Sequence, residues 1–128
     1  MAVFADQAEF TNTMDRMVAI LAADETFQQR ASWVNTSVGF ELTDVDAEYT
    51  LVIEKGKTSG QATGAEQARL GVKVSSETFD KMMSNKLDVE SAYFRGEIKL
   101  RGGEYLGEQA AQYLHYFAQA YNAARAED

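Results

Sequence analysis

The sequence predicts a single α+β domain in which helices cover one face of a five-stranded, mostly antiparallel sheet. Apolar residues recur every three or four positions near both ends of the chain, as they do in amphipathic helices. Between these two regions, apolar and polar residues alternate in short runs, which is the pattern of half-buried strands. In the clearest of these runs the charged residues fall opposite the aliphatic ones, which indicates that helices cover only one side of this mixed sheet.

The first expected element is a helix from Asp6 to Ala22. Asp6 followed by Glu9 is similar to a capping box, in which side chains bond the free N–H groups of a helix start. The helix carries one apolar stripe, formed by Phe10, Met14, Met17, Val18 and Leu21. We expect this stripe to pack in the core, and Phe27 to close the helical region before the sheet begins.

Two strands joined by a turn are expected next. The run from Trp33 to Thr43 alternates, and its apolar face carries Val34, Thr36, Val38, Phe40 and Leu42. Asp44 to Asp46 supplies a turn. The second strand then runs from Glu48 to Glu54, with Tyr49, Leu51 and Ile53 on one face.

Three further strands complete the predicted sheet. A turn at Lys55 to Lys57 leads to an edge strand from Thr58 to Thr63, whose polar and glycine content a sheet edge tolerates. After a crossover link, a fourth strand is indicated by the alternation of Leu70, Val72 and Val74. A fifth strand follows Gly96, with Ile98 and Leu100 on its apolar face.

Two short helical segments are expected between the fourth and fifth strands. Ser75 to Glu77 suits a helix start, because hydroxyls cap free N–H groups and an acid favours the positive end. The apolar face of this helix carries Phe79, Met82 and Met83. Asp88 is positioned to cap a second short turn.

One long helix from Glu104 to Ala124 is expected to end the chain. Its stripe consists of Leu106, Ala110, Tyr113, Leu114, Phe117 and Tyr121. Leu106, Ala110 and Leu114 fit an ordinary core. The three wide rings fit equally well a core or the wall of a cavity that slender side chains leave open.

Composition excludes several functional classes. The 128 residues are 45% hydrophobic, which suffices for one core, so we expect one domain over residues 1–128. A net charge of -8 argues against nucleic acid and against a polybasic membrane anchor. The sequence contains no run of about 18 apolar residues, so nothing in it predicts membrane insertion. The chain has no cysteine, which suits a reducing compartment, and we expect the cytoplasm.

The residues needed for common catalytic sites are missing from the sequence. His115 is the only histidine, lies on the polar side of the last predicted helix, and has no cysteine to accompany it. We therefore expect no catalytic residue, no metal and no cofactor.

The stretch from Ser75 to Gly103 resembles the signature of the sterol carrier protein type two domain, a sterol-binding or lipid-transfer module. The resemblance lies in Ser75-x-x-x-Phe79, in Lys86-Leu87-Asp88, and in Ala92, Tyr93, Phe94, Gly96, Ile98, Lys99, Leu100 and Gly102. It extends roughly from Val34 to Tyr121 and implies the same order of helices and strands that the periodicities predict. It also implies an apolar tunnel between sheet and helices that holds fatty acid, fatty acyl-CoA or sterol. Val89 stands where the family commonly has proline, and Arg-Gly-Gly-Glu follows Leu100 where Gly-Asp or Gly-Asn is more usual, so the sterol preference is not carried over.

The favoured function is non-catalytic binding, with or without transfer, of such a lipid or another long apolar molecule. The expected tunnel walls are Phe40, Leu51, Phe79, Met82, Met83, Phe94, Ile98, Leu100, Tyr113 and Phe117. The alternative is a structural or oligomerisation module with a small or filled cavity, which forms a homodimer or accompanies a partner enzyme. A filled core and a lined cavity use the same residue types, so the sequence leaves both interpretations open.

Overall fold

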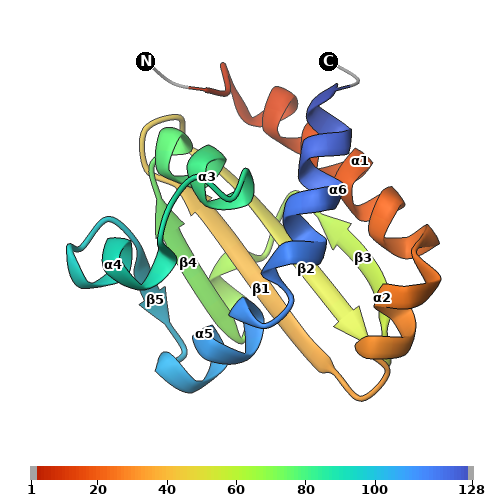
Figure 1. The fold of residues 1–128 in the computed structure, drawn as a ribbon. Coiled ribbons are helices and arrows are strands. Elements are labelled where there is room, and N and C mark those ends of the chain that lie inside the picture. Colours follow the sequence, from red (N-terminus) through yellow and green to blue (C-terminus); the bar gives the residue numbers. More distant parts are fainter. Residues whose placement is uncertain (1–2, 127–128) are drawn as a thin grey trace.

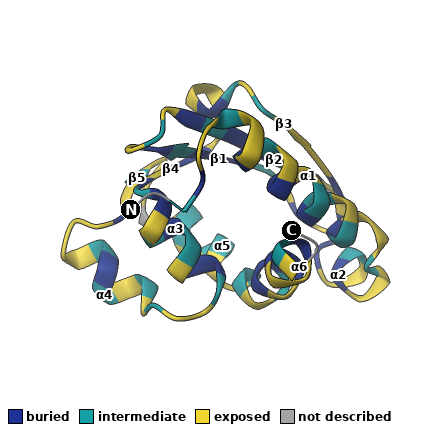
Figure 2. Ribbon diagram, turned by 90° about the horizontal axis from the view of Figure 1, so that it is seen from above, coloured by how far each residue is buried: buried dark blue, intermediate teal, exposed yellow. Residues whose placement is uncertain are grey.

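A computed structural model describes residues 3–126 and confirms the α+β class with one five-stranded mixed sheet (Figure 1). The helices are α1 (Gln7–Ala23), α2 (Glu25–Arg30), α3 (Ser76–Met83), α4 (Val89–Phe94), α5 (Glu104–Ala111) and α6 (Leu114–Ala126), with a 3-10 turn η1 (Ala65–Gln67). The strands are β1 (Asn35–Leu42), β2 (Ala47–Glu54), β3 (Lys57–Gln61), β4 (Leu70–Val74) and β5 (Lys99–Arg101). The helices lie on one side of the sheet (Figure 2).

The strands lie in the order β3-β2-β1-β4-β5, so β1 is the central strand. It pairs antiparallel with β2, where Phe40 lies opposite Tyr49, and parallel with β4, where Phe40 lies opposite Val72. The two-residue loop between β2 and β3 consists of Lys55 and Gly56, both at positive φ, as a tight hairpin turn requires. A parallel neighbour cannot follow directly in the chain, so the link from β3 to β4 must cross the sheet.

The crossover lies on the sheet face that the helices do not cover, so this face is partly covered as well. A Cβ atom added to Gly39 of β1 would lie 2.4 Å from the Ala65 carbonyl oxygen, so only glycine permits this approach. Arg101 donates hydrogen bonds from Nη1 to the Ala68 oxygen (2.9 Å) and from Nη2 to the Ala65 oxygen (3.0 Å). The crossover is thereby fixed to both β1 and β5.

The predicted helix starts are confirmed at two of three positions. Asp6 accepts a hydrogen bond from the Glu9 N–H (2.9 Å), and Ser75 accepts one from the Thr78 N–H (3.1 Å). Asp88 occupies the cap position of α4 but bonds the Ser91 hydroxyl instead of a backbone N–H. Phe27 was expected only to close the first helical region, whereas the structure forms a separate helix α2 around it, capped by Asp24.

Phe79 stands at the centre of an aromatic core between the sheet and the helices. Its ring lies 5.2 Å from Phe10, 5.4 Å from Phe40 and 5.7 Å from Tyr121, measured between ring centroids, in edge-on arrangements that such rings favour. Tyr121 is fully buried and its hydroxyl donates to Asp80 Oδ1 (2.7 Å). These rings join α1, α3, α6 and the sheet into one core.

The expectation of a single long C-terminal helix is wrong, because the chain bends at Gln112 and Tyr113 between α5 and α6 (Figure 1). The Tyr113 N–H bonds the Ala110 carbonyl three residues back, which tightens the last turn of α5. After the bend α6 packs along α1, and Arg16 Nε donates to the Ala124 carbonyl (3.2 Å). No glycine or proline lies at the bend, and the apolar stripe of the sequence continues through it without interruption.

Candidate functional site

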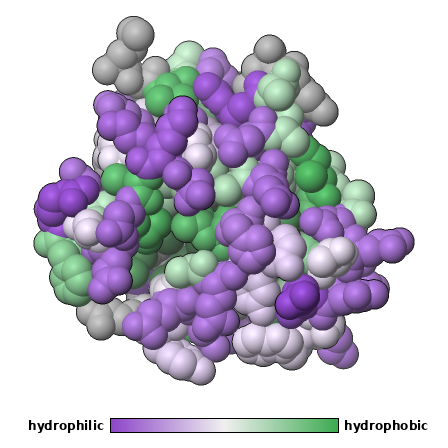
Figure 3. All heavy atoms as spheres, viewed as in Figure 1, coloured by the Kyte–Doolittle hydropathy of each residue, from purple (hydrophilic) through white to green (hydrophobic). Residues whose placement is uncertain are grey.

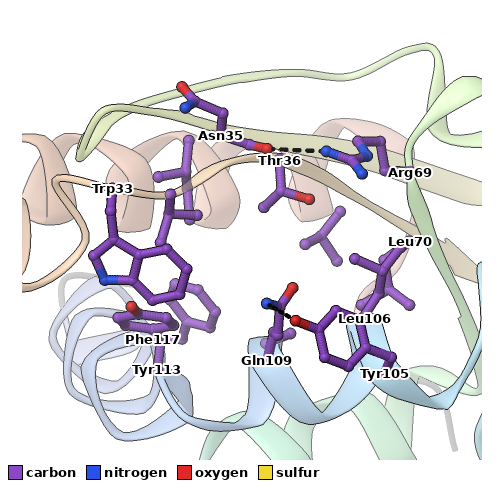
Figure 4. A pocket seen from close by; sticks show the side chains of 14 residues that line it. Trp33, Asn35, Thr36, Arg69, Leu70, Tyr105, Leu106, Gln109, Tyr113 and Phe117 are labelled. Carbon is purple, nitrogen blue, oxygen red and sulfur yellow. Dashed lines mark hydrogen bonds between the residues drawn. The ribbon is translucent and has the colours of Figure 1, made fainter.

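Two cavities lie between the sheet and the helices. The larger, here called the α5–β1 cavity, has a volume of about 480 Å³ (Figure 4). Its lining residues are Trp33, Val34, Asn35, Thr36, Val38, Ile53, Arg69, Leu70, Tyr105, Leu106, Gln109, Ala110, Tyr113 and Phe117. One wall is thus the start of β1 and β4, and the opposite wall is α5 together with the first turn of α6.

The second, here called the α3–α4 cavity, has a volume of about 310 Å³. Its lining residues are Val38, Phe40, Leu70, Val72, Met82, Met83, Val89, Glu90, Tyr93, Phe94, Ile98, Leu100, Gly107, Glu108, Ala110, Ala111, Leu114 and Phe117. In Figure 3 hydrophobic side chains gather around a hollow on this side of the molecule, in the region of α3, α4 and α5. Most of the lining is apolar, so the cavity suits an apolar occupant.

The two cavities share a wall, because Val38, Leu70, Ala110 and Phe117 line both of them. Small-molecule sites in proteins commonly occupy about 300 to 1,000 Å³ and are lined mainly by apolar side chains. Either cavity reaches this range alone. A long, thin molecule that passed between the sheet and α5 would contact both cavities along the four shared residues.

Short side chains on α5 leave this space open. Gly107, Ala110 and Ala111 face the α3–α4 cavity, and a Cβ atom added to Gly107 would lie 3.0 Å from Leu100 Cδ1. The start of α5 is held close to the sheet, because the backbone of Gly102 (φ 111°) packs against the Arg69 carbonyl. A glycine is required there, since an added Cβ would lie 2.3 Å from that oxygen.

The charged side chains at the two cavities have opposite signs. Arg69 is the one charged residue that lines the α5–β1 cavity, whereas Glu90 and Glu108 are the charged residues that line the α3–α4 cavity, among the residues that the structure describes. Arg69 Nη1 donates to the Asn35 carbonyl oxygen (3.2 Å), at the upper rim in Figure 4. The two openings therefore present different electrostatic environments to a ligand.

Aromatic side chains stand exposed at both cavities. Trp33 is 61% and Tyr105 71% exposed at the α5–β1 cavity, and Phe94 is 74% exposed at the α3–α4 cavity. The Tyr113 ring packs between Trp33 and Phe27, at centroid distances of 6.5 Å and 6.1 Å. Burial raises the pKa of the Tyr113 hydroxyl, so this ring wall is neutral.

The structure brings together most of the residues that the sequence proposed as tunnel walls. Seven of them line the α3–α4 cavity: Phe40, Met82, Met83, Phe94, Ile98, Leu100 and Phe117. Tyr113 lines the α5–β1 cavity, together with Phe117. Leu51 and Phe79 line neither cavity; both are fully buried in the core. Tyr121, considered for either role, also belongs to the core.

Several lining residues were missed by the sequence reasoning. Val38 and Leu70 lie on the predicted apolar faces of their strands, so the strand alternation contained the signal for them. The strand alternation placed Trp33 and Arg69 on the face opposite the apolar residues, whereas both line the α5–β1 cavity because each lies just before its strand begins. Tyr105 lies at the start of α5 and outside the predicted apolar stripe, so no signal in the sequence pointed to it.

Reactive groups are not gathered at either cavity. Within residues 3–126 no group of three or more His, Cys, Asp or Glu side chains could hold a metal ion. His115 is exposed and lines neither cavity. The arrangement offers burial of apolar surface, with isolated charges at the openings. None of the helices formed by residues 3–126 has the length and apolar character needed to cross a membrane.

Comparison with known proteins gives one family. The model of the SCP-2 sterol transfer family matches residues 17–114. No curated protein is similar enough in sequence to count as a match.

Among solved structures, a conserved hypothetical protein from Thermus thermophilus has a TM-score of 0.71 and 16% identity, with 88% of this chain and 85% of that chain covered. Palmitated SCP2L2 from Aedes aegypti has a TM-score of 0.56 and 18% identity, with 90% of this chain and 96% of that chain covered. A double mutant of the sec-alkyl sulfatase PisA1, an enzyme from Pseudomonas sp., has a TM-score of 0.57 and 25% identity. It covers 63% of this chain, which spans only 13% of the sulfatase chain.

Proposed function

Because this chain belongs to the SCP-2 sterol transfer family, we propose that it binds a lipid or another long apolar molecule without chemically changing it. The ligand occupies the space between the sheet and α5, where Val38, Leu70, Ala110 and Phe117 line both cavities. This continuous apolar wall is the observation that carries the proposal. Fatty acid, fatty acyl-CoA and sterol are the ligand classes that the family suggests, and palmitate is present in one similar structure.

The lining supports a ligand that gains affinity from chain length. Each methylene buried against such walls contributes about 0.8 kcal/mol, which corresponds to roughly a four-fold change in Kd. Met82 and Met83 add adaptability, since their unbranched side chains repack around different shapes. The protein therefore discriminates among ligands mainly by length and width.

The decisive experiment is native mass spectrometry of protein purified without detergent, followed by extraction and identification of any retained molecule. Displacement of Nile red, a neutral apolar dye, by alcohols of 8, 10 and 12 carbons then gives the dependence on chain length. We expect Kd to fall by roughly fifteen-fold for each pair of added methylenes. A protein that retains no apolar molecule and binds neither the dye nor the alcohols would contradict the proposal.

The second candidate is a module that accompanies an enzyme, or that assembles as a homodimer. The likeness to part of the much longer sec-alkyl sulfatase chain favours the association with an enzyme, because a similar domain forms part of that enzyme's chain. Size-exclusion chromatography with light scattering tests the homodimer. Pull-down from the source cells, with protein loaded with dodecan-1-ol and with empty protein, tests a partner enzyme. Under the primary proposal neither is required for ligand binding.

A further inference from the structure

The two openings differ in the one property that orients an amphiphile, which is charge. Among the described residues, the α5–β1 cavity is lined by a guanidinium and by no carboxylate, and the α3–α4 cavity is lined by two carboxylates and by no cation. The chain as a whole carries a net charge of -8, so an anion is repelled from most of its surface. Arg69 is therefore the one charged side chain at the α5–β1 cavity, among the described residues, that can attract an anion.

Arg69 is held in place by backbone contacts on both sides. Its N–H donates to Ser37 Oγ (2.9 Å), and its side chain donates from Nη1 to the Asn35 carbonyl (3.2 Å). Gly102, just before α5, packs against its carbonyl oxygen. A guanidinium has five N–H donors, so further donors remain after the bond from Nη1 to Asn35 and can serve a ligand.

A second donor lies on the opposite wall. The Tyr105 hydroxyl accepts a hydrogen bond from Gln109 Nε2 (3.2 Å), which leaves its own proton available to a ligand. In Figure 4 both residues lie at the right-hand end of the cavity, Arg69 on the sheet wall above and Tyr105 on α5 below. An oxyanion at this end of the cavity can accept a charge-assisted hydrogen bond from the Arg69 guanidinium, and the Tyr105 hydroxyl offers a neutral donor on the facing wall.

We infer that the opening beside Arg69 and Tyr105 is an anion subsite, which selects single-chain amphiphiles with a carboxylate head and fixes their direction. The head lies at Arg69, and the tail passes along Val38, Leu70, Ala110 and Phe117 into the α3–α4 cavity. The carboxylates of Glu90 and Glu108 disfavour the reverse direction, since like charges repel. This inference rests on the proposed function, and it makes Arg69 a specificity-determining residue.

The test compares three ligands of one chain length that differ only in the head: dodecanoate, dodecan-1-ol and dodecylammonium. Nile red displacement at pH 8 gives each Kd, because the neutral dye does not compete for charge. We expect wild-type protein to bind dodecanoate about five-fold more tightly than dodecan-1-ol, as one partly exposed charge pair allows. In 1 M salt this preference should fall, because screening weakens exposed ion pairs.

The variants separate the subsite from the apolar cavity. Arg69→Gln should abolish the preference for dodecanoate over dodecan-1-ol, Arg69→Lys should retain part of the preference, and Tyr105→Phe should reduce it. Lys57→Gln is the matched control, because it removes the same charge from an exposed position on β3 that lines neither cavity. It should leave all three affinities unchanged.

Two results would overturn the inference. If Arg69→Gln weakens dodecanoate and dodecan-1-ol equally, or if only Glu90→Gln and Glu108→Gln change the head preference, the head does not lie at Arg69. In both cases dodecan-1-ol still binds wild-type protein, so the proposed function survives. If no ligand binds the wild type, the proposed function fails and the subsite fails with it.

Discussion

Filling the junction of the two cavities should abolish ligand binding without unfolding the protein. Ala110 is half-buried on α5 and lines both cavities, so a ring placed there by Ala110→Phe projects into open space. If the ring displaces about four methylenes of a bound chain, the loss is about 3 kcal/mol, or roughly 200-fold in Kd. Stability should change by less than about 1 kcal/mol, because the helix-propensity difference between alanine and phenylalanine is small.

The matched control is the same substitution on the neighbouring helix. Ala120 of α6 is fully buried and lines neither cavity, so Ala120→Phe forces a ring into packed core. Overpacking of this kind typically costs about 1–3 kcal/mol, which lowers Tm by about 3–5 °C per kcal/mol in a domain of this size. If that variant does not fold, Ala120→Val makes the same comparison more mildly.

The assay for both variants is thermal unfolding followed by circular dichroism, beside Nile red displacement by dodecan-1-ol. The cavity interpretation expects Ala110→Phe to keep its Tm and lose binding, and the Ala120 variants to lose Tm. If Ala110→Phe is destabilised as strongly as Ala120→Phe, the space beside α5 is closed in solution and the reasoning is refuted.

Two further predictions concern the fold. Burial, and then hydrogen bonds to Asp15 and Asp80, raise the pKa of Tyr49 and Tyr121 above the ordinary value of about 10, so the folded chain keeps phenolic protons that the unfolded chain releases. Stability should therefore be unaffected below pH 10 and fall above it, by up to about 1.4 kcal/mol per pH unit for each tyrosine; a Tm equal at pH 8.5 and 11 would contradict this. Gly39→Ala should cost about 2 kcal/mol or more, because its Cβ would meet the Ala65 carbonyl at 2.4 Å. Gly107→Ala, whose nearest neighbour is the flexible end of Leu100, should be neutral or stabilising in urea unfolding, and equal losses in both variants would argue against a rigid crossover.

Local patterns predicted the elements well because each was determined by neighbouring residues. The alternation of Tyr49, Leu51 and Ile53 reports one buried face, and the structure buries all three. The Asp6 and Ser75 caps depend on donors three residues away, which a sequence displays directly. The same reasoning could not separate core from cavity, since Phe79 and Met83 share one face of α3 while only Met83 lines a cavity.

The bend between α5 and α6 shows why the rest of the site was beyond sequence reasoning. The stripe through Ala110, Tyr113 and Phe117 is regular, and no residue type at the bend signals a change of direction. The bend depends on distant partners: Tyr113 contacts Phe27 and Trp33, while α6 packs on α1. Residues of α5 and of the bend, among them Tyr105 and Tyr113, line the α5–β1 cavity, so these tertiary contacts determine its shape.

The crossover clamped by Arg101 has a consequence for how relatives of this protein diverge. The crossover and Arg101 pack on the sheet face opposite the helices, at Gly39 and Gly71. A larger residue at Gly39 would clash with Ala65, and one at Gly71 would clash with the Arg101 guanidinium. The crossover thus prevents the sheet from moving away from the cavities, so a relative that binds a larger ligand cannot gain space by shifting the sheet. Among relatives with ligands of different size, we expect substitutions to accumulate in α3, α4 and α5, which form the opposite wall. The sequences of β1 and β4 should vary much less.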